Sequence, residues 1–453
     1  MSRTWLHFGI SFFYLTFFWM VAESNAFVQK PEITKKAQIK QQIAQLIKKL
    51  DSNQRVVRQQ SEIELISLGK PVLTLLPPPE LVSSNSVRDT LQRVREQIEK
   101  RVAKDSIQAS TVNLTGKHSL KKIFMKITEQ TGNQLDVARL SNALLNAKMD
   151  VNFVDCPFWE AIDDLTRKRY LTYQINSSNG YLEFNQVRQN QPNPSVELTH
   201  VYYSGPFRIE IEKVLRRPLV GNTSRELLRA TFLIQVEPRL RPLFLSYSSS
   251  ELEAKGNKTH KLPPFNPHAK YELPLGEGGK NLKFSMQWIL DRNQLPKTIE
   301  IQGRLKMELA AETLPITFDH LSRSKGALRR RGNISVELID AKSMKHDSKQ
   351  NLNVRIALSY DYSGPAFESH RTWIYHNRAF LQNSQGKKYW LNGSSQTTLE
   401  STGKISVLYQ FTDLPQAETS YQFTYLAPTL ITSAPIDFHF EAIPLPGKNV
   451  VDD

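Results

Sequence analysis

The chain has 453 residues, of which 40% are hydrophobic and 23% are charged, and its formal net charge is +15. This is an ordinary globular composition, and the length predicts roughly two to four domains, each large enough to bury a core. A single cysteine, Cys156, excludes an intramolecular disulfide. The basic residues are spread along the chain, so the charge favours anionic partners and indicates no specific nucleic-acid-binding arm.

Residues 1–26 have the pattern of a secretory signal peptide. Arg3 precedes the uncharged, mostly apolar run Phe8–Ala22, and the small residues Ser24 and Ala26 follow it. We expect cleavage after Ala26 and export to the periplasm or cell envelope, which excludes most intracellular enzyme classes. Because the run approaches the roughly 20 residues of a spanning helix, a retained anchor is the alternative. Charges interrupt every later apolar stretch, so no further transmembrane segment is expected.

Residues 27–108 are predicted to be helical. Apolar residues recur at helical spacing in two stripes, and Gly69-Lys70-Pro71 between them ends one helix and opens another. The segment resembles a degenerate HEAT-type helical repeat, which implies protein binding and a need for a stacked neighbour. The stripes consist of Ile43, Leu46, Ile47 and Leu50, then Val87, Leu91, Val94, Ile98 and Val102.

Residues 109–188 are predicted to form a small α+β domain of βαββαβ order with a final strand. Two segments with helical spacing alternate with short strand-like stretches, and Thr131-Gly132 ends the first helix. The sequences SLKKIFMKITEQTGNQLDV and MDVNFVDCPFWEAIDDLTRKRYLTYQI resemble the secretin and TonB short N-terminal domain. That resemblance implies two helices packed on a small sheet, a role in protein contacts in the periplasm, and no catalytic residues.

Residues 195–320 and 333–445 are predicted to form two β-sandwich (Ig-like) domains. Apolar residues alternate with polar ones in many short stretches, as at Phe207, Ile209 and Ile211, and turn residues separate these stretches. An arginine-rich loop near 323–332 is expected to divide the two sandwiches. The predicted fold class is therefore multidomain, α+β and mainly β.

The order of these segments resembles that of uncharacterised exported proteins of planctomycete bacteria. The stretches RATFLIQVEPRLRPL and PIDFHFEAIPLP carry the same resemblance. It implies an architecture and a source, and it implies no reaction.

Two groups of residues are candidates for binding. Arg329, Arg330 and Arg331 form the densest basic cluster, which would either bind an anionic surface or be a solvated loop. We favour the loop, because no aromatic residues alternate with the arginines as in a single-strand nucleic-acid site. Trp373 and Tyr375 would share one face of an alternating strand, either as a platform for a sugar or as part of a sandwich core, which we favour.

The sequence contains no familiar catalytic motif. It lacks zinc-binding histidine pairs, a nucleophile elbow and a phosphate-binding loop, so no catalytic, cofactor-binding or metal residues are predicted. Asp163-Asp164 is predicted to lie on a helix surface and to pair with the basic run Arg167-Lys168-Arg169. Cys156 has apolar neighbours and is expected to be a small apolar filler, with a reactive thiol or an intermolecular bridge as the alternatives.

These expectations favour a non-enzymatic exported envelope protein that acts as a scaffold or protein-binding module. Its partners would be envelope proteins or anionic envelope polymers, with no cofactor and no specific nucleic acid. The alternative is a carbohydrate- or cell-wall-binding or wall-active protein that uses a β-sandwich. The sequence leaves the ligand and the oligomeric state open.

Overall fold

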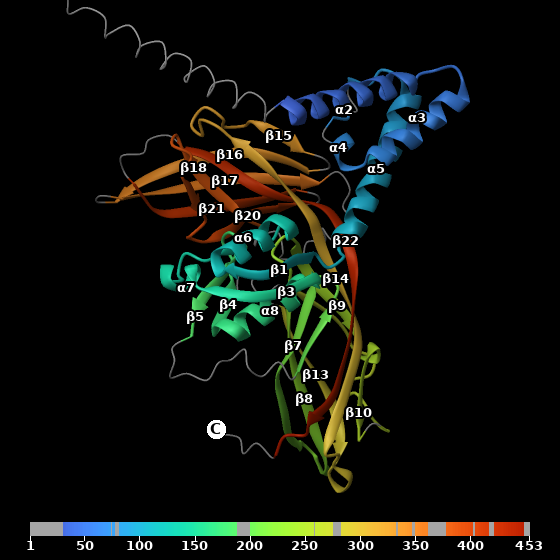
Figure 1. Ribbon diagram of the computed structural model, residues 1–453, viewed down its shortest axis with the longest axis vertical. Coiled ribbons are helices and arrows are strands. Elements are labelled where there is room, and N and C mark those ends of the chain that lie inside the picture. Colours follow the sequence, from blue (N-terminus) through green and yellow to red (C-terminus); the bar gives the residue numbers. More distant parts are fainter. Residues whose placement is uncertain are drawn as a thin grey trace, which may run out of the picture. The chain divides into compact units, whose positions relative to one another are not determined.

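The computed structural model divides the chain into two compact units, with the boundary in the sequence between Val102 and Ala103. Each unit is described by itself. Within the described residues, no helix is both long and apolar enough to span a membrane. The signal segment lies outside the described residues, which are 30–73, 75–77, 81–187, 200–257, 259–274, 282–331, 334–346, 349–360, 377–401, 404–415 and 421–447 (Figure 1).

The first unit is helical, as its two apolar stripes predict. Its helices are α2 (Lys30–Lys49), α3 (Arg55–Leu68), α4 (Lys70–Leu73) and α5 (Asn85–Ser106), the last of which continues into the second unit. Gly69 takes a positive φ of 68° where α3 ends, a conformation that glycine adopts at little cost. The core of this unit contains the buried residues Ile43, Leu46, Leu50, Leu65, Val72, Leu76, Val87, Leu91, Val94 and Ile98.

The second unit begins with a small α+β region, residues 109–187. Its first long helix starts after Ser119, whose hydroxyl accepts a hydrogen bond from the Lys122 backbone N–H, and ends at Gly132 with φ 73°. The elements are β1 (Thr111–Ser119), α6 (Leu120–Thr131), β2 (Leu135–Asp136), α7 (Asn142–Asn146), β3 (Lys148–Pro157), α8 (Phe158–Arg169), β4 (Leu171–Ile175) and β5 (Leu182–Gln186).

The strands of this region form two sheets rather than the one sheet that was expected. Strands β1 and β3 pair antiparallel, whereas β5 lies between β2, which is parallel to it, and β4, which is antiparallel. The apolar faces of α6 and α8 meet in one core. Phe124, Phe158 and Phe184 are buried there, and Tyr203 from the following β-structure packs against the same cluster.

The rest of the second unit is β-structure. In the described part of the chain, its strands form a four-stranded, an eight-stranded and a five-stranded sheet, and the strands of the eight-stranded sheet alternate along the sequence with groups of strands from the other two. Their longer strands are β7 (Phe207–Leu219), β8 (Asn222–Val236), β9 (Arg241–Ser248), β13 (Leu282–Asp291), β14 (Thr298–Phe318), β16 (Ile334–His346), β17 (Lys349–Tyr360), β21 (Lys404–Pro415) and β22 (Tyr421–Pro444).

The shorter strands complete these sheets. They are β6 (Val201–Ser204), β10 (Leu252–Gly256), β11 (His260–Leu262), β12 (Lys270–Pro274), β15 (Leu328–Arg331), β18 (Ala379–Asn383), β19 (Lys388–Trp390) and β20 (Ser395–Ser401).

The β-structure contains two apolar cores that share one sheet. The first core includes Phe207, Phe232 and Trp288, and the second core includes Val336, Tyr409 and Phe423. Strands β14 and β22 run side by side for most of their length, and both strands supply residues to both cores (Figure 1). The expected segments 195–320 and 333–445 therefore do not coincide with the two cores, because the long central sheet continues from one core into the other.

Candidate functional site

The arginine-rich segment is an edge strand. Residues Leu328–Arg331 form β15, which pairs antiparallel with β16 at one end of the five-stranded sheet. All four side chains of the strand are exposed. The expected loop is thus replaced by a short strand, whereas the expected exposure of Arg329, Arg330 and Arg331 is observed.

The three arginines do not all face the same way. Arg329 lies opposite Val336 and Arg330 lies opposite Ser335, so their side chains leave opposite faces of the sheet. The Arg329 guanidinium carbon lies 5.4 Å from the centre of the Phe318 ring, in a cation–π contact at the rim of the second core. Arg329 therefore has a packing role, and Arg330 presents its charge on the other face.

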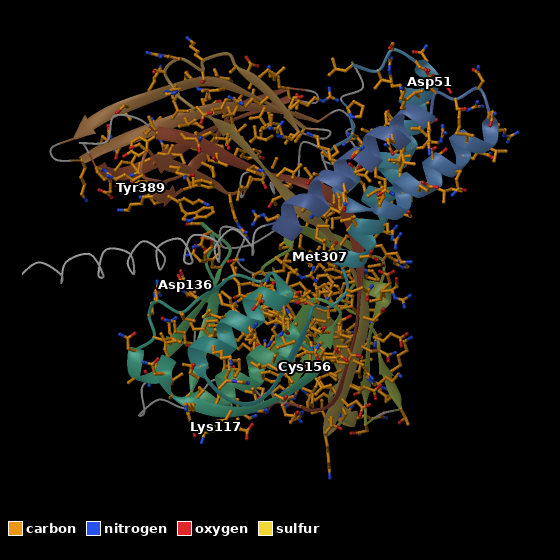
Figure 2. The ribbon with its side chains drawn as sticks, turned by 45° about the horizontal axis from the view of Figure 1, so that its top comes forward. Asp51, Lys117, Asp136, Cys156, Met307 and Tyr389 are labelled. Atoms are coloured by element: carbon orange, nitrogen blue, oxygen red, sulfur yellow. The ribbon has the colours of Figure 1, made fainter. Side chains whose placement is uncertain are left out.

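A second basic edge combines lysines with aromatic rings. Strand β19 is the edge of the eight-stranded sheet, next to β18. The Lys387 Nζ lies 5.1 Å from the centre of the Tyr389 ring, and the Lys388 Nζ lies 4.7 Å from that of Phe380. The rings of Phe380 and Trp390 are 4.9 Å apart. Figure 2 labels Tyr389 on this edge.

Sequence reasoning missed this second edge, although the run Lys387-Lys388-Tyr389-Trp390 signals it directly. Cations next to aromatic rings are suited to anionic, ring-containing polymers. The aromatic pair that was proposed, Trp373 and Tyr375, lies outside the described residues.

The Asp163-Asp164 pair behaves differently from the prediction. For Asp164 the prediction is confirmed, since its carboxylate forms ion pairs with Arg167 and Lys168 at 3.2 and 2.7 Å. Asp163 is only 3% exposed, and its Oδ2 accepts a hydrogen bond from Arg208 Nε at 2.8 Å. The prediction is wrong for Asp163 because its side chain is enclosed by Tyr173, Tyr203 and Arg208, which come from other elements, and is shielded from water.

The Asp163 carboxylate has three donors. Tyr173 donates to Oδ1 at 3.0 Å, and Tyr203 donates to Oδ2 at 2.6 Å, beside the Arg208 bond. Arg208 in turn donates to Glu210 and Gln235. Burial, followed by the charge of Asp163, raises the pKa of Tyr173 and of Tyr203 well above the usual value of 10.0. Both hydroxyls stay protonated at neutral pH and serve as donors.

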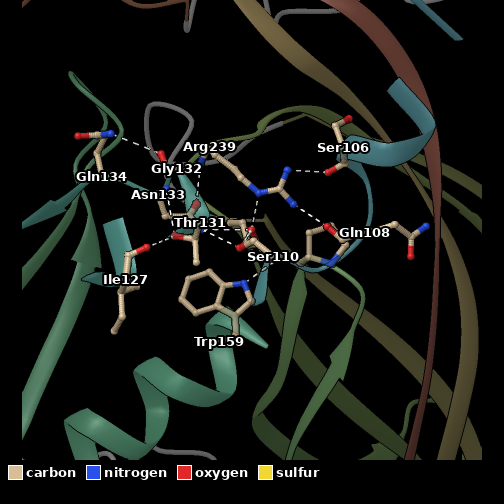
Figure 3. A network of polar contacts seen from close by, with 12 residues as sticks. Ser106, Gln108, Ser110, Ile127, Thr131, Gly132, Asn133, Gln134, Trp159 and Arg239 are labelled. Atoms are coloured by element: carbon tan, nitrogen blue, oxygen red, sulfur yellow. Dashed lines mark hydrogen bonds and ion pairs between the residues drawn. The ribbon is translucent and has the colours of Figure 1, made fainter. Parts of the chain in front are cut away.

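A second buried network joins the small α+β region to the first core (Figure 3). Glu237 is 1% exposed and accepts hydrogen bonds from the Ser110 backbone and hydroxyl at 2.9 and 2.6 Å. Arg239 donates to Glu237 at 2.6 Å, and its other nitrogens donate to the carbonyl oxygens of Ser106 and Gln108. Asn133 donates to Glu237 and accepts from the Arg239 backbone.

The two networks attach the small region firmly to the β-structure. Between them, the Trp159 indole nitrogen donates to the Pro206 carbonyl oxygen at 3.1 Å. Charged groups that are buried and fully hydrogen-bonded hold one arrangement, because loss of either partner exposes the other to an apolar interior. The charges of these networks are thus used for internal attachment.

The single cysteine of the sequence, Cys156, lies on strand β3 of the small α+β region. Cys156 is partly buried against the small region's core (Figure 2), and burial raises the pKa of its thiol to about 11. The thiol is therefore protonated at neutral pH, as an apolar filler would be. No group of three histidine, cysteine, aspartate or glutamate side chains that could hold a metal ion occurs within the ranges given above.

Comparison with known protein families, curated proteins and solved structures finds no match to this chain.

Proposed function

We propose that this protein is a non-enzymatic scaffold or binding module that acts after export, in the periplasm or cell envelope. Its partners are acidic envelope proteins or anionic envelope polymers. The HEAT-like pattern of residues 27–108 and the secretin-like pattern of residues 109–188 support protein contacts, since both families make them. Two Ig-like sandwiches would then present the binding edges.

The observation that carries the proposal is the exposed arginine strand β15. Three consecutive arginines place positive charge on both faces of a sheet edge, on a backbone that the sheet holds in place. Charged side chains on an edge also oppose the addition of a further strand. The partner is therefore held by charge and not by strand pairing, and its binding weakens as salt screens the arginines.

The test measures binding of the full chain to poly-L-glutamate at low and physiological salt. Replacement of Arg329, Arg330 and Arg331 by glutamine should lower the affinity at least tenfold and flatten the salt dependence. The matched control replaces Lys117, Lys121 and Lys122, which are exposed on the small α+β region, by glutamine. Equal losses in both triple variants would show that total charge alone matters, and would contradict the proposal.

A second candidate function rests on the β19 edge. Lys387 over Tyr389, and Lys388 over Phe380 next to Trp390, favour an anionic glycan, because a sugar ring can stack on an aromatic ring while the ammonium group pairs with its carboxylate. On this alternative, a polyuronate binds more tightly than poly-L-glutamate, and Trp390→Ala abolishes that preference. A polyuronate that binds no better than poly-L-glutamate would remove the alternative.

A further inference from the structure

The hairpin formed by β7 and β8 ends in an exposed apolar turn. Leu219 pairs with Asn222, so Val220 and Gly221 form the turn between the two strands. Pro218 is exposed, Leu219 is partly exposed, and Val220 is 97% exposed. A Cβ built on Gly221, which has φ 83°, would meet no atom within 4 Å, so the turn projects away from the described structure around it.

Packing within the chain does not account for the apolar run Pro218-Leu219-Val220. None of the three residues belongs to the first core. Two-residue hairpin turns usually contain glycine, asparagine or aspartate, and an exposed run of three apolar residues is unfavourable in water. The turn therefore presents an apolar surface that the fold itself does not use.

Basic residues flank this turn on both strands. Residues 213–229 contain one acidic residue, Glu226, and five basic residues, which are Lys213, Arg216, Arg217, Arg225 and Arg229. Glu226 is 1% exposed and forms ion pairs with Arg216 and Arg292 at 2.9 and 3.1 Å. Two arginines thus enclose the carboxylate of the hairpin, and the other four basic side chains are exposed.

Three of the exposed arginines share the outer face of the four-stranded sheet. Arg217 lies opposite Leu227, and Arg225 and Arg229 are two positions before and after Leu227 on β8. Because strand residues two apart point to the same face, these arginines point away from the face that carries the core residue Phe232. The outer face next to the apolar turn is therefore basic.

The acidic residue opposite this face leaves the positive charge in excess. Asp291 of β13 lies opposite Arg225, and its Oδ1 accepts a hydrogen bond from the Asn293 backbone N–H. The neighbours of Arg217 and Arg229 across the strands are uncharged, namely Leu227, Leu215 and Gln287. An apolar apex with a basic collar complements a surface that is negatively charged outside and apolar beneath.

We propose that the tip of the β7–β8 hairpin binds the surface of an anionic lipid membrane. Leu219 and Val220 enter the boundary between head groups and acyl chains, and Arg217 and Arg225 contact the phosphates. A lipid layer encloses a convex turn without a matching pocket, which a protein partner would have to provide. This surface belongs to the four-stranded sheet and is distinct from the β15 and β19 edges of the proposed function.

The experiment is cosedimentation of the chain from Phe27 onward, the form expected after signal cleavage, with lipid vesicles. We expect binding to vesicles of phosphatidylglycerol and phosphatidylcholine in equal parts, and none to phosphatidylcholine alone. Binding should weaken as salt screens the arginines. Absence of binding to the phosphatidylglycerol vesicles at low salt, or equal binding to both kinds of vesicle, would overturn the proposal.

A valine substitution locates the apolar part of the contact. Val220→Asn should lower the affinity for the phosphatidylglycerol vesicles about tenfold, because it removes an aliphatic side chain from the interface. Its high exposure means that the fold does not depend on it. Val154→Asn is the matched control, since Val154 on β3 is also a valine and is 67% exposed. Equal losses in the two variants would refute the proposal.

An arginine variant locates the charged part. Joint replacement of Arg217 and Arg225 by glutamine should lower vesicle affinity about 30-fold. The same change at Lys117 and Lys122 of the small α+β region should leave it unchanged. Binding of poly-L-glutamate, which the proposed function assigns to β15, should persist in the Arg217 and Arg225 variant. Loss of poly-L-glutamate binding with native vesicle binding would make the tip a polymer-binding surface and overturn the membrane proposal.

Discussion

Removal of the Asp163 carboxylate should destabilise the folded chain far more than removal of its neighbour. Asp163 accepts three hydrogen bonds in a buried position, from Tyr173, Tyr203 and Arg208. Each buried donor left without an acceptor costs about 1–3 kcal/mol, and breaking a buried ion pair costs about 3–5 kcal/mol. Because Arg208 keeps its bond to Glu210, we expect Asp163→Leu to lower the free energy of unfolding by about 3–5 kcal/mol and no more.

A double-mutant cycle separates the ion pair from the tyrosine bonds. Arg208→Met leaves Asp163 with both tyrosine donors, so this variant should lower the free energy of unfolding by less, about 2–3 kcal/mol. The double variant should lose less than the sum of the two single changes by about 1–3 kcal/mol. The measurement is the free energy of unfolding in urea, followed by the tryptophan fluorescence of the chain, to which Trp159 at the same junction contributes.

Asp164→Leu is the matched control on the same helix. The ion pairs of Asp164 with Arg167 and Lys168 lie near the surface, so this variant should lower the free energy of unfolding by less than about 1 kcal/mol. Equal losses for the two aspartates, or a coupling energy below about 0.5 kcal/mol between Asp163 and Arg208, would refute the reasoning.

Three further outcomes follow from the structure. Phe158→Asp places an unpaired carboxylate in the core of the small region and should cost several kcal/mol in the same urea assay. The raised pKa values of Tyr173 and Tyr203 predict that the free energy of unfolding is highest below about pH 10 and falls as the pH rises further. The reason is that the folded state keeps protons that the unfolded state releases. Urea titrations at pH 8 to 11 measure this fall. Iodoacetamide at pH 8 should alkylate Cys156 about 100-fold more slowly in the folded than in the unfolded chain, since its pKa rises from 9.0 to about 11.

Much of the local structure could be predicted from the sequence. The spacing of Leu120, Ile123, Phe124 and Ile127 predicts one apolar helix face, and all four side chains are buried in α6. The basic runs at both sheet edges can also be recognised in the sequence, because exposed charge depends on composition and not on distant partners. The helix ends at Gly69 and Gly132 are predicted for the same local reason.

Only the tertiary structure determines which helix and strand faces pack against one another. Asp163 and Asp164 are adjacent and chemically identical, but they point about 100° apart around the helix, so Asp163 is buried against Arg208 while Asp164 stays partly exposed and pairs with Lys168. The partner of Asp163, Arg208, lies 45 positions further along the chain, and no local pattern links them. Likewise, alternation predicts that β22 is a strand, but pairing with β14 places its two halves in different cores. Periodicity reports that a side chain is buried, whereas long-range pairing determines what buries it.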